Sequence, residues 1–117
     1  MRQSKKHYLQ ILEVEMEDLR EDLELMIEEC RKNYQSEKIT EHVFLANLTL
    51  FRNELLGLDE FFRIVDTTEC DSFETLETMM DYLRNRFREK MSTGGLAEAL
   101  YICIERKLNK VARYVTQ

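Results

Sequence analysis

The amino-acid sequence predicts an all-α protein, an antiparallel up-down four-helix bundle that forms one domain over residues 1–117. The chain contains no proline and only three glycines, whereas sandwiches and barrels need many turn residues. Apolar residues recur at alternating steps of three and four in four stretches, the spacing of a helix that buries one side. The breaks between these stretches are short, which predicts that consecutive helices are antiparallel neighbours.

The first helix is predicted over about residues 4–34, with Ser4 as its N-cap. Most of its other positions carry carboxylates, which predicts a solvated acidic side. The predicted buried seam consists of Leu9, Leu12, Met16, Leu19, Leu23, Met26 and Cys30.

The second helix is predicted over about residues 40–66, and either Ser36 or Thr40 can cap it. Its seam runs from Phe44 to Val65, and a second apolar stripe lies off that seam. A helix with two apolar stripes must be covered on two sides, so the second stripe is a candidate interface between two copies of the chain. Its glycine marks either a kink or a close approach of another backbone. This stripe consists of Val43, Leu50, Gly57 and Ile64.

The third and fourth helices are predicted over about residues 72–91 and 95–115. Asp71 and Glu74 have the spacing of a capping box for the third helix. These two helices are shorter than the first pair, so one end of the first hairpin must project, bend or be covered by a second chain. The length difference and the two-sided second helix together favour a homodimer.

Composition and charge narrow the classes of partner. The net charge of −6 disfavours nucleic-acid binding. Residues 1–66 carry 9 basic and 15 acidic side chains, whereas residues 67–117 carry 8 of each, so the two halves should attract each other. No apolar run approaches the roughly 18–20 residues of a membrane span. The three cysteines are widely spaced and form no zinc motif, which favours free thiols in the reducing cytoplasm.

One polar pair lies within the apolar arc of the second helix. Asn47 and Glu54 are seven residues apart and share one side. A buried carboxylate is costly unless it is paired, and Arg86 and Lys90 flank the third seam as candidate partners. Two interpretations follow: a structural ion pair or dimer contact, or the polar floor of a ligand pocket with Glu54 as an acid, base or anchor.

The segment Thr93-Gly94-Gly95 is a candidate anion site ahead of the fourth helix, because free N–H groups at a helix start bind phosphate or carboxylate. The alternative is a glycine C-cap followed by an N-cap. Glu21, Glu24 and Glu28 share faces of the first helix, but such pairs arise by chance in so acidic a segment. No histidine has the Glu-x-x-His spacing of di-iron bundles. We therefore predict neither a metal nor a cofactor.

These observations predict a non-enzymatic helical interaction protein, an adaptor, regulator or chaperone-like module that self-associates through its second helix and can also bind a protein partner. The alternative is an enzyme or binding protein for a small molecule or nucleotide, with Mg²⁺ or without it, whose site includes Asn47 and Glu54.

Overall fold

The computed structural model describes the backbone of residues 2–94 and 98–116 and the side chains of residues 4–91 and 98–116. Four α-helices make up nearly all of it: α1 (Arg2–Gln35), α2 (Glu41–Asp66), α3 (Leu76–Gly94) and α4 (Glu98–Thr116). A short 3₁₀ helix, η1 (Cys70–Ser72), precedes α3. The described ranges contain no strand, so the prediction of an all-α fold with four helices is confirmed.

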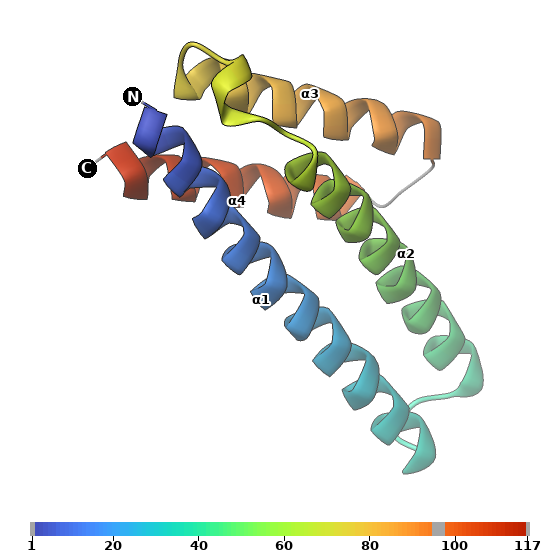
Figure 1. Cartoon of the computed structure of the whole chain (residues 1–117). Helices are drawn as coiled ribbons and strands as arrows, with labels where there is room; N and C mark the ends of the chain where they lie inside the picture. The colour runs from blue at the N-terminus through green and yellow to red at the C-terminus, as the bar shows by residue number, and fades with distance from the viewer. Residues whose placement is uncertain (1, 95–97, 117) are drawn as a thin grey trace.

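The four helices are arranged as two pairs. Figure 1 shows α1 and α2 as a long hairpin, with α3 and α4 lying across the end that contains the first half of α1 and the second half of α2. The molecule measures 54 × 29 × 18 Å. Because the second pair runs across the first, the up-down order predicted for all four helices is not confirmed. Within the single chain one end of the long hairpin projects, and its cover by a second chain stays a prediction.

The core lies where the two pairs cross, and all four helices contribute to it. Phe61 of α2 meets Phe87 of α3 edge-on, with ring centroids 5.1 Å apart. Burying such rings and branched side chains contributes roughly 1.5–3 kcal/mol each. The fully buried side chains are Tyr8, Leu12, Met16, Leu58, Phe61, Met79, Leu83, Phe87, Ile104, Leu108 and Val111.

The loop between α1 and α2 ends one helix and caps the next. Glu37 adopts the left-handed region at φ 63°, and its N–H bonds the Tyr34 carbonyl while that of Lys38 bonds the Asn33 carbonyl. These two bonds form a Schellman motif, which satisfies carbonyls at the end of α1. Thr40 accepts a hydrogen bond from the Val43 N–H at 3.2 Å, so Thr40, one of the two predicted caps, is the N-cap of α2, and Ser36 is not.

Two predicted helix starts are wrong. Ser4 lies inside α1, because the helix already includes Arg2. The region predicted as the start of the third helix forms η1 and an extended residue, Phe73, whose carbonyl accepts a hydrogen bond from the Lys5 ammonium group. This contact with α1 holds the segment extended, and α3 begins only after Thr75.

Ion pairs join the acidic first half of the chain to the basic end of α4. Glu15 of α1 binds Lys107 at 3.0 Å and Lys110 at 2.7 Å. Within the hairpin, Arg20 of α1 binds Asp59 of α2 at 2.6 Å. These ion pairs are an attraction between the two halves where α4 meets α1.

Across residues 2–94 and 98–116, no helix combines the length and apolar character that crossing a membrane would require.

Candidate functional site

One end of the α1–α2 hairpin projects beyond the second pair (Figure 1). We call residues 24–52, which include this end, the distal half. Tyr34 and Phe44 close its tip by stacking, with ring centroids 4.5 Å apart and planes 7° from parallel. Neither α3 nor α4 extends over the distal half, so side chains of the predicted α1 seam are exposed there. Met26, predicted as buried, is 50% exposed for this reason.

A groove runs between α1 and α2 in the distal half. Its volume is about 510 Å³, and apolar atoms make up most of its lining, although half of the lining side chains are polar or charged. Cys30 is buried at its floor, Phe51 is half-buried, and Leu25 on its rim is 68% exposed. The lining residues are Leu25, Met26, Glu28, Glu29, Cys30, Lys32, Asn33, Ile39, Asn47 and Phe51.

The predicted polar pair lies at this groove and just beyond it. Asn47 is half-buried and lines the groove. Glu54 is half-buried at the boundary with the covered part of α2, and its burial raises the pKa of the carboxyl group above the ordinary value. Among the described residues, Glu54 makes no hydrogen bond or ion pair with Arg86.

The structure does not pair Glu54 with Arg86, one of its two predicted cationic partners on α3. Arg86 is half-buried on α3 and binds Glu89 of the same helix at 3.5 Å. Lys90 is exposed one turn later. The described contacts therefore do not assemble Asn47, Glu54 and Arg86 into one polar cluster.

The second apolar stripe of α2 divides at the boundary of the distal half. Gly57 and Ile64 are buried within the chain. Val43 and Leu50 are exposed, at 40% and 46%. The chain itself covers the second side of α2 near the core and leaves it open towards the tip.

The candidate anion site falls at the end of α3. Thr93 and Gly94 are the last described residues of that helix, where backbone carbonyls rather than N–H groups are left free. Gly95 and the Thr93 side chain lie outside the described residues, as does the predicted start of the fourth helix.

The acidic residues of α1 form a solvated side. Glu21, Glu24 and Glu28 are exposed. In the part of the chain that the structure describes, no group of three or more His, Cys, Asp or Glu side chains is arranged to hold a metal ion.

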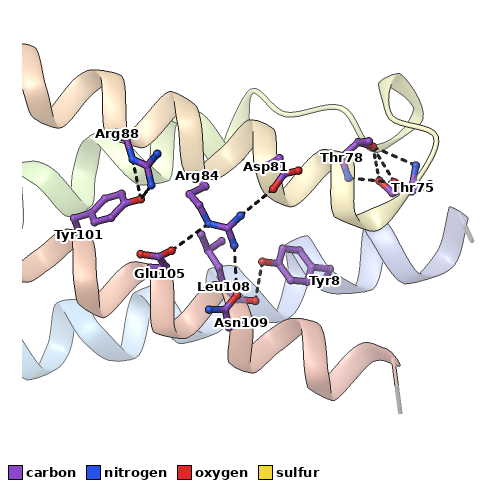
Figure 2. A network of polar contacts seen from close by, with 10 residues as sticks. All are labelled: Tyr8, Thr75, Thr78, Asp81, Arg84, Arg88, Tyr101, Glu105, Leu108 and Asn109. Atoms are coloured by element: carbon purple, nitrogen blue, oxygen red, sulfur yellow. Dashed lines mark hydrogen bonds and ion pairs between the residues drawn. The ribbon is translucent and has the colours of Figure 1, made fainter.

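A polar network that the sequence did not reveal links α1, α3 and α4. Figure 2 shows the Arg84 guanidinium of α3 between Asp81, at 2.9 Å, and Asn109 of α4, at 3.4 Å. Its Nε lies 3.4 Å from a carboxylate oxygen of Glu105. Beside it, the buried Tyr8 hydroxyl donates to the Leu108 carbonyl at 3.0 Å (Figure 2).

One signal in the sequence could have located part of this network. Lys5, Tyr8 and Leu12 share one face of a helix, being three and four residues apart. The predicted seam begins at Leu9, whereas Tyr8 and Lys5 are more buried than Leu9. Both side chains are buried because their polar ends reach backbone carbonyls on other elements.

Comparison of the chain with protein-family models, with curated proteins and with solved structures found no match.

Proposed function

We propose that this protein is a non-enzymatic helical interaction module that binds a helix of another protein at the distal half of its α1–α2 hairpin. The observation that carries this proposal is the open groove, whose lining includes the apolar side chains of Leu25, Met26, Cys30, Ile39 and Phe51. Exposed apolar patches with polar rims are typical of interaction sites. Leu25, Met26, Val43 and Leu50 add exposed apolar area around this groove.

The mode of binding follows from the shape of the site. Two antiparallel helices with a groove between them accept a third amphipathic helix, whose apolar side chains at every third or fourth position fill the space. The three cysteines are free thiols, which supports a reducing, cytoplasmic setting for this function.

Binding of a neutral amphipathic peptide to the whole chain tests the proposal. The peptide has three repeats of Leu-Gln-Gln-Leu-Leu-Gln-Leu, and calorimetry measures its affinity. We expect binding with a negative heat-capacity change, since apolar area is buried. The double variant Leu25→Ser/Leu50→Ser should weaken binding at least tenfold, because Leu25 lines the groove and Leu50 is exposed on α2, three residues from Asn47 in its lining.

A matched control is available on the same two helices. Val14 and Leu56 are also exposed, at 61% and 59%, but neither lines the groove. The variant Val14→Ser/Leu56→Ser should bind as the parent does. Equal affinity for all three proteins would show that the groove is not the binding surface.

Self-association through α2 is a second candidate, favoured by the exposure of Val43 and Leu50. A homodimer that joins these side chains would cover the second stripe where the chain leaves it open. Light scattering after size exclusion at micromolar concentration measures the mass. A dimer that Val43→Glu/Leu50→Glu converts to a monomer supports this candidate, and a monomer in both cases removes it.

A ligand pocket with Asn47 and Glu54 has weaker support. The raised pKa of Glu54 is typical of a functional carboxyl group. Its predicted partner Arg86 is bound to Glu89 instead. Retention of every binding property in a Glu54→Gln variant would exclude a role for this carboxylate.

A further inference from the structure

Two further acidic residues of α1 lie on the same side of the helix as Glu15, which binds α4. Glu15 binds both Lys107 and Lys110. Asp22 and Glu29 follow it by seven and fourteen residues, and positions seven apart lie on nearly the same side of a helix. Both are exposed, and among the described residues neither forms an ion pair.

The groove lies on the side of the hairpin that the second helix pair covers nearer the core. On α2, Phe61 contacts Phe87 of α3, and Glu54 and Asn47 precede Phe61 by seven and fourteen residues. Asn47 and Glu29 both line the groove. The same side of the hairpin is therefore occupied near the core and open in the distal half.

The helix α4 shows which chemistry this side of the hairpin binds. Its apolar stripe is buried in the core, while Lys107 and Lys110 flank that stripe and bind Glu15 of α1. The stripe consists of Leu100, Ile104, Leu108 and Val111. The distal half offers the matching elements a second time: an apolar floor that includes Met26 and Phe51, and carboxylates along the α1 rim.

We propose that the groove of the distal half binds a basic amphipathic helix from another protein. Its apolar side chains pack between Met26 and Phe51, and its Lys or Arg side chains pair with Glu29, which lines the groove, and with Asp22, which lies two turns nearer the core. This inference rests on the proposed function and adds the charge of the partner. The chain's own α4 cannot be the occupant, because its apolar stripe is already buried.

Charge complementarity is local to the α1 rim. Glu28 lines the groove, but it is 3.7 Å from Arg31, so its charge is partly balanced. Lys32, the cation among the lining residues, lies nearer the tip. The basic side chains of the partner are therefore expected beside Asp22 and Glu29 rather than beside the loop.

Three peptides with one leucine pattern test the charge of the partner. Each contains three repeats of the sequence given above, with Lys, Gln or Glu at every polar position, and fluorescence anisotropy measures binding to the whole chain. We expect the Lys peptide to bind at least tenfold more tightly than the Gln peptide, and the Glu peptide most weakly. Equal affinity of the Lys and Gln peptides would overturn the inference.

A pair of charge-reversed variants locates the site. Asp22→Lys/Glu29→Lys should weaken binding of the Lys peptide at least tenfold. The control, Glu17→Lys/Glu24→Lys, changes the net charge equally with the same spacing on the opposite side of α1, and should change the affinity less than twofold. All four side chains are exposed, and circular dichroism checks that both variants keep their helix content. Equal weakening in both would mean attraction by net charge alone and would overturn the inference.

The outcomes separate this inference from the proposed function. If the Gln peptide binds as tightly as the Lys peptide and Leu25→Ser/Leu50→Ser abolishes both, the interaction module stands and its preference for a basic helix is rejected. If no peptide binds, both proposals fail. If the chain forms a dimer that the Lys peptide does not dissociate, the groove belongs to a second copy, and the inference is overturned.

Discussion

Single polar side chains of α1 fix how the second helix pair sits on the first. The Tyr8 hydroxyl crosses from α1 to the Leu108 carbonyl of α4, and its burial raises the pKa of the phenol well above the ordinary value. A buried hydroxyl without a hydrogen-bond partner destabilises the fold. The bond is lost if α4 shifts along α1, so it favours the observed position of α4.

Removing that hydroxyl should destabilise the protein with little change in packing. We expect Tyr8→Phe to lower the free energy of unfolding by about 1 kcal/mol, the usual net contribution of such a hydrogen bond. Urea unfolding followed by circular dichroism measures the change. Tyr114→Phe serves as the control, because that ring is 63% exposed, and it should leave stability unaltered. A loss of equal size in both variants would argue against a special role for Tyr8.

Replacing the left-handed residue in the α1–α2 loop by glycine should increase the stability of the protein. Glu37 carries a Cβ atom at φ 63°, where glycine has no steric penalty. We expect Glu37→Gly to stabilise the protein by about 1 kcal/mol. A raised urea midpoint with an unchanged slope would be the measurement, and Glu37→Ala should show no gain. Destabilisation by glycine would mean that the Glu37 side chain makes a favourable contribution in the loop.

Two glutamates two positions apart should have opposite effects on stability at low pH. Hydrogen bonds from Lys110 and Lys107 lower the pKa of Glu15. A lowered pKa in the folded state stabilises the fold above the pKa of the unfolded state, and this stabilisation is lost as the pH falls through the folded value. For Glu13, a hydrogen bond with Asp66 is the largest cause of a raised pKa, followed by burial. Its contribution is present below the unfolded pKa and is lost as the pH rises through the folded value.

Glutamine variants separate the two effects. We expect Glu15→Gln to lower the urea midpoint at about pH 7 and to reduce its fall towards about pH 4, since the charged form is the one that stabilises. Glu13→Gln should raise the midpoint at about pH 7, because the amide can donate to Asp66 as the protonated acid does. Shifts of the same sign in the two variants would contradict this assignment.

At the scale of elements, the four helices could be predicted because their apolar periodicity is long and regular. The start of α3 could not, because it depends on contacts with α1. Asp71 and Glu74 have the spacing of a capping box, but Thr75 and Thr78 form the cap. The Thr78 N–H bonds the Thr75 hydroxyl at 3.1 Å, and the Thr75 N–H bonds the Thr78 hydroxyl at 3.3 Å. Sequence spacing cannot choose between two overlapping caps when a distant Lys5 holds Phe73 extended.

Alanine substitutions can compare the predicted capping residue of α3, Glu74, with the observed one, Thr75. Thr75→Ala should destabilise the protein by about 1 kcal/mol, because the Thr78 N–H at the start of α3 loses the Thr75 hydroxyl as its partner. Glu74→Ala, at the exposed position of the predicted box, should change stability little. Thermal unfolding measures both. A larger loss from Glu74→Ala than from Thr75→Ala would favour the predicted cap over the observed one.

At the scale of the whole molecule, the region near the core and the distal half of the α1–α2 hairpin differ in how many helices pack together. Near the core, every helix has neighbours on two sides, and the largest buried side chains are found there. In the distal half, α1 and α2 have only each other. The sequence predicted the excess length of the first hairpin and a second apolar stripe of Val43, Leu50, Gly57 and Ile64, of which Gly57 and Ile64 are buried within the chain. It could not predict which part of α2 the second pair covers, because that depends on the angle at which the pairs cross.

Amide hydrogen exchange should record this difference as a gradient along the hairpin. We expect amides around Leu12 and Leu58 to exchange only through global unfolding, and those around Cys30 and Asn47 through local opening of the tip. Mass spectrometry of exchanged peptides measures the protection. A uniform free energy of opening along α1 would show that the distal half is as stable as the core.

The position of the two chain ends gives the projecting hairpin a further consequence. His7 and Tyr114 lie together, with ring centroids 6.2 Å apart, and both helix ends are at the opposite extreme of the molecule from the α1–α2 loop (Figure 1). Anything attached to either end is therefore held away from the groove along the 54 Å axis. The helix ends and the proposed binding surface are spatially separated, so a group attached at either end would leave the groove accessible.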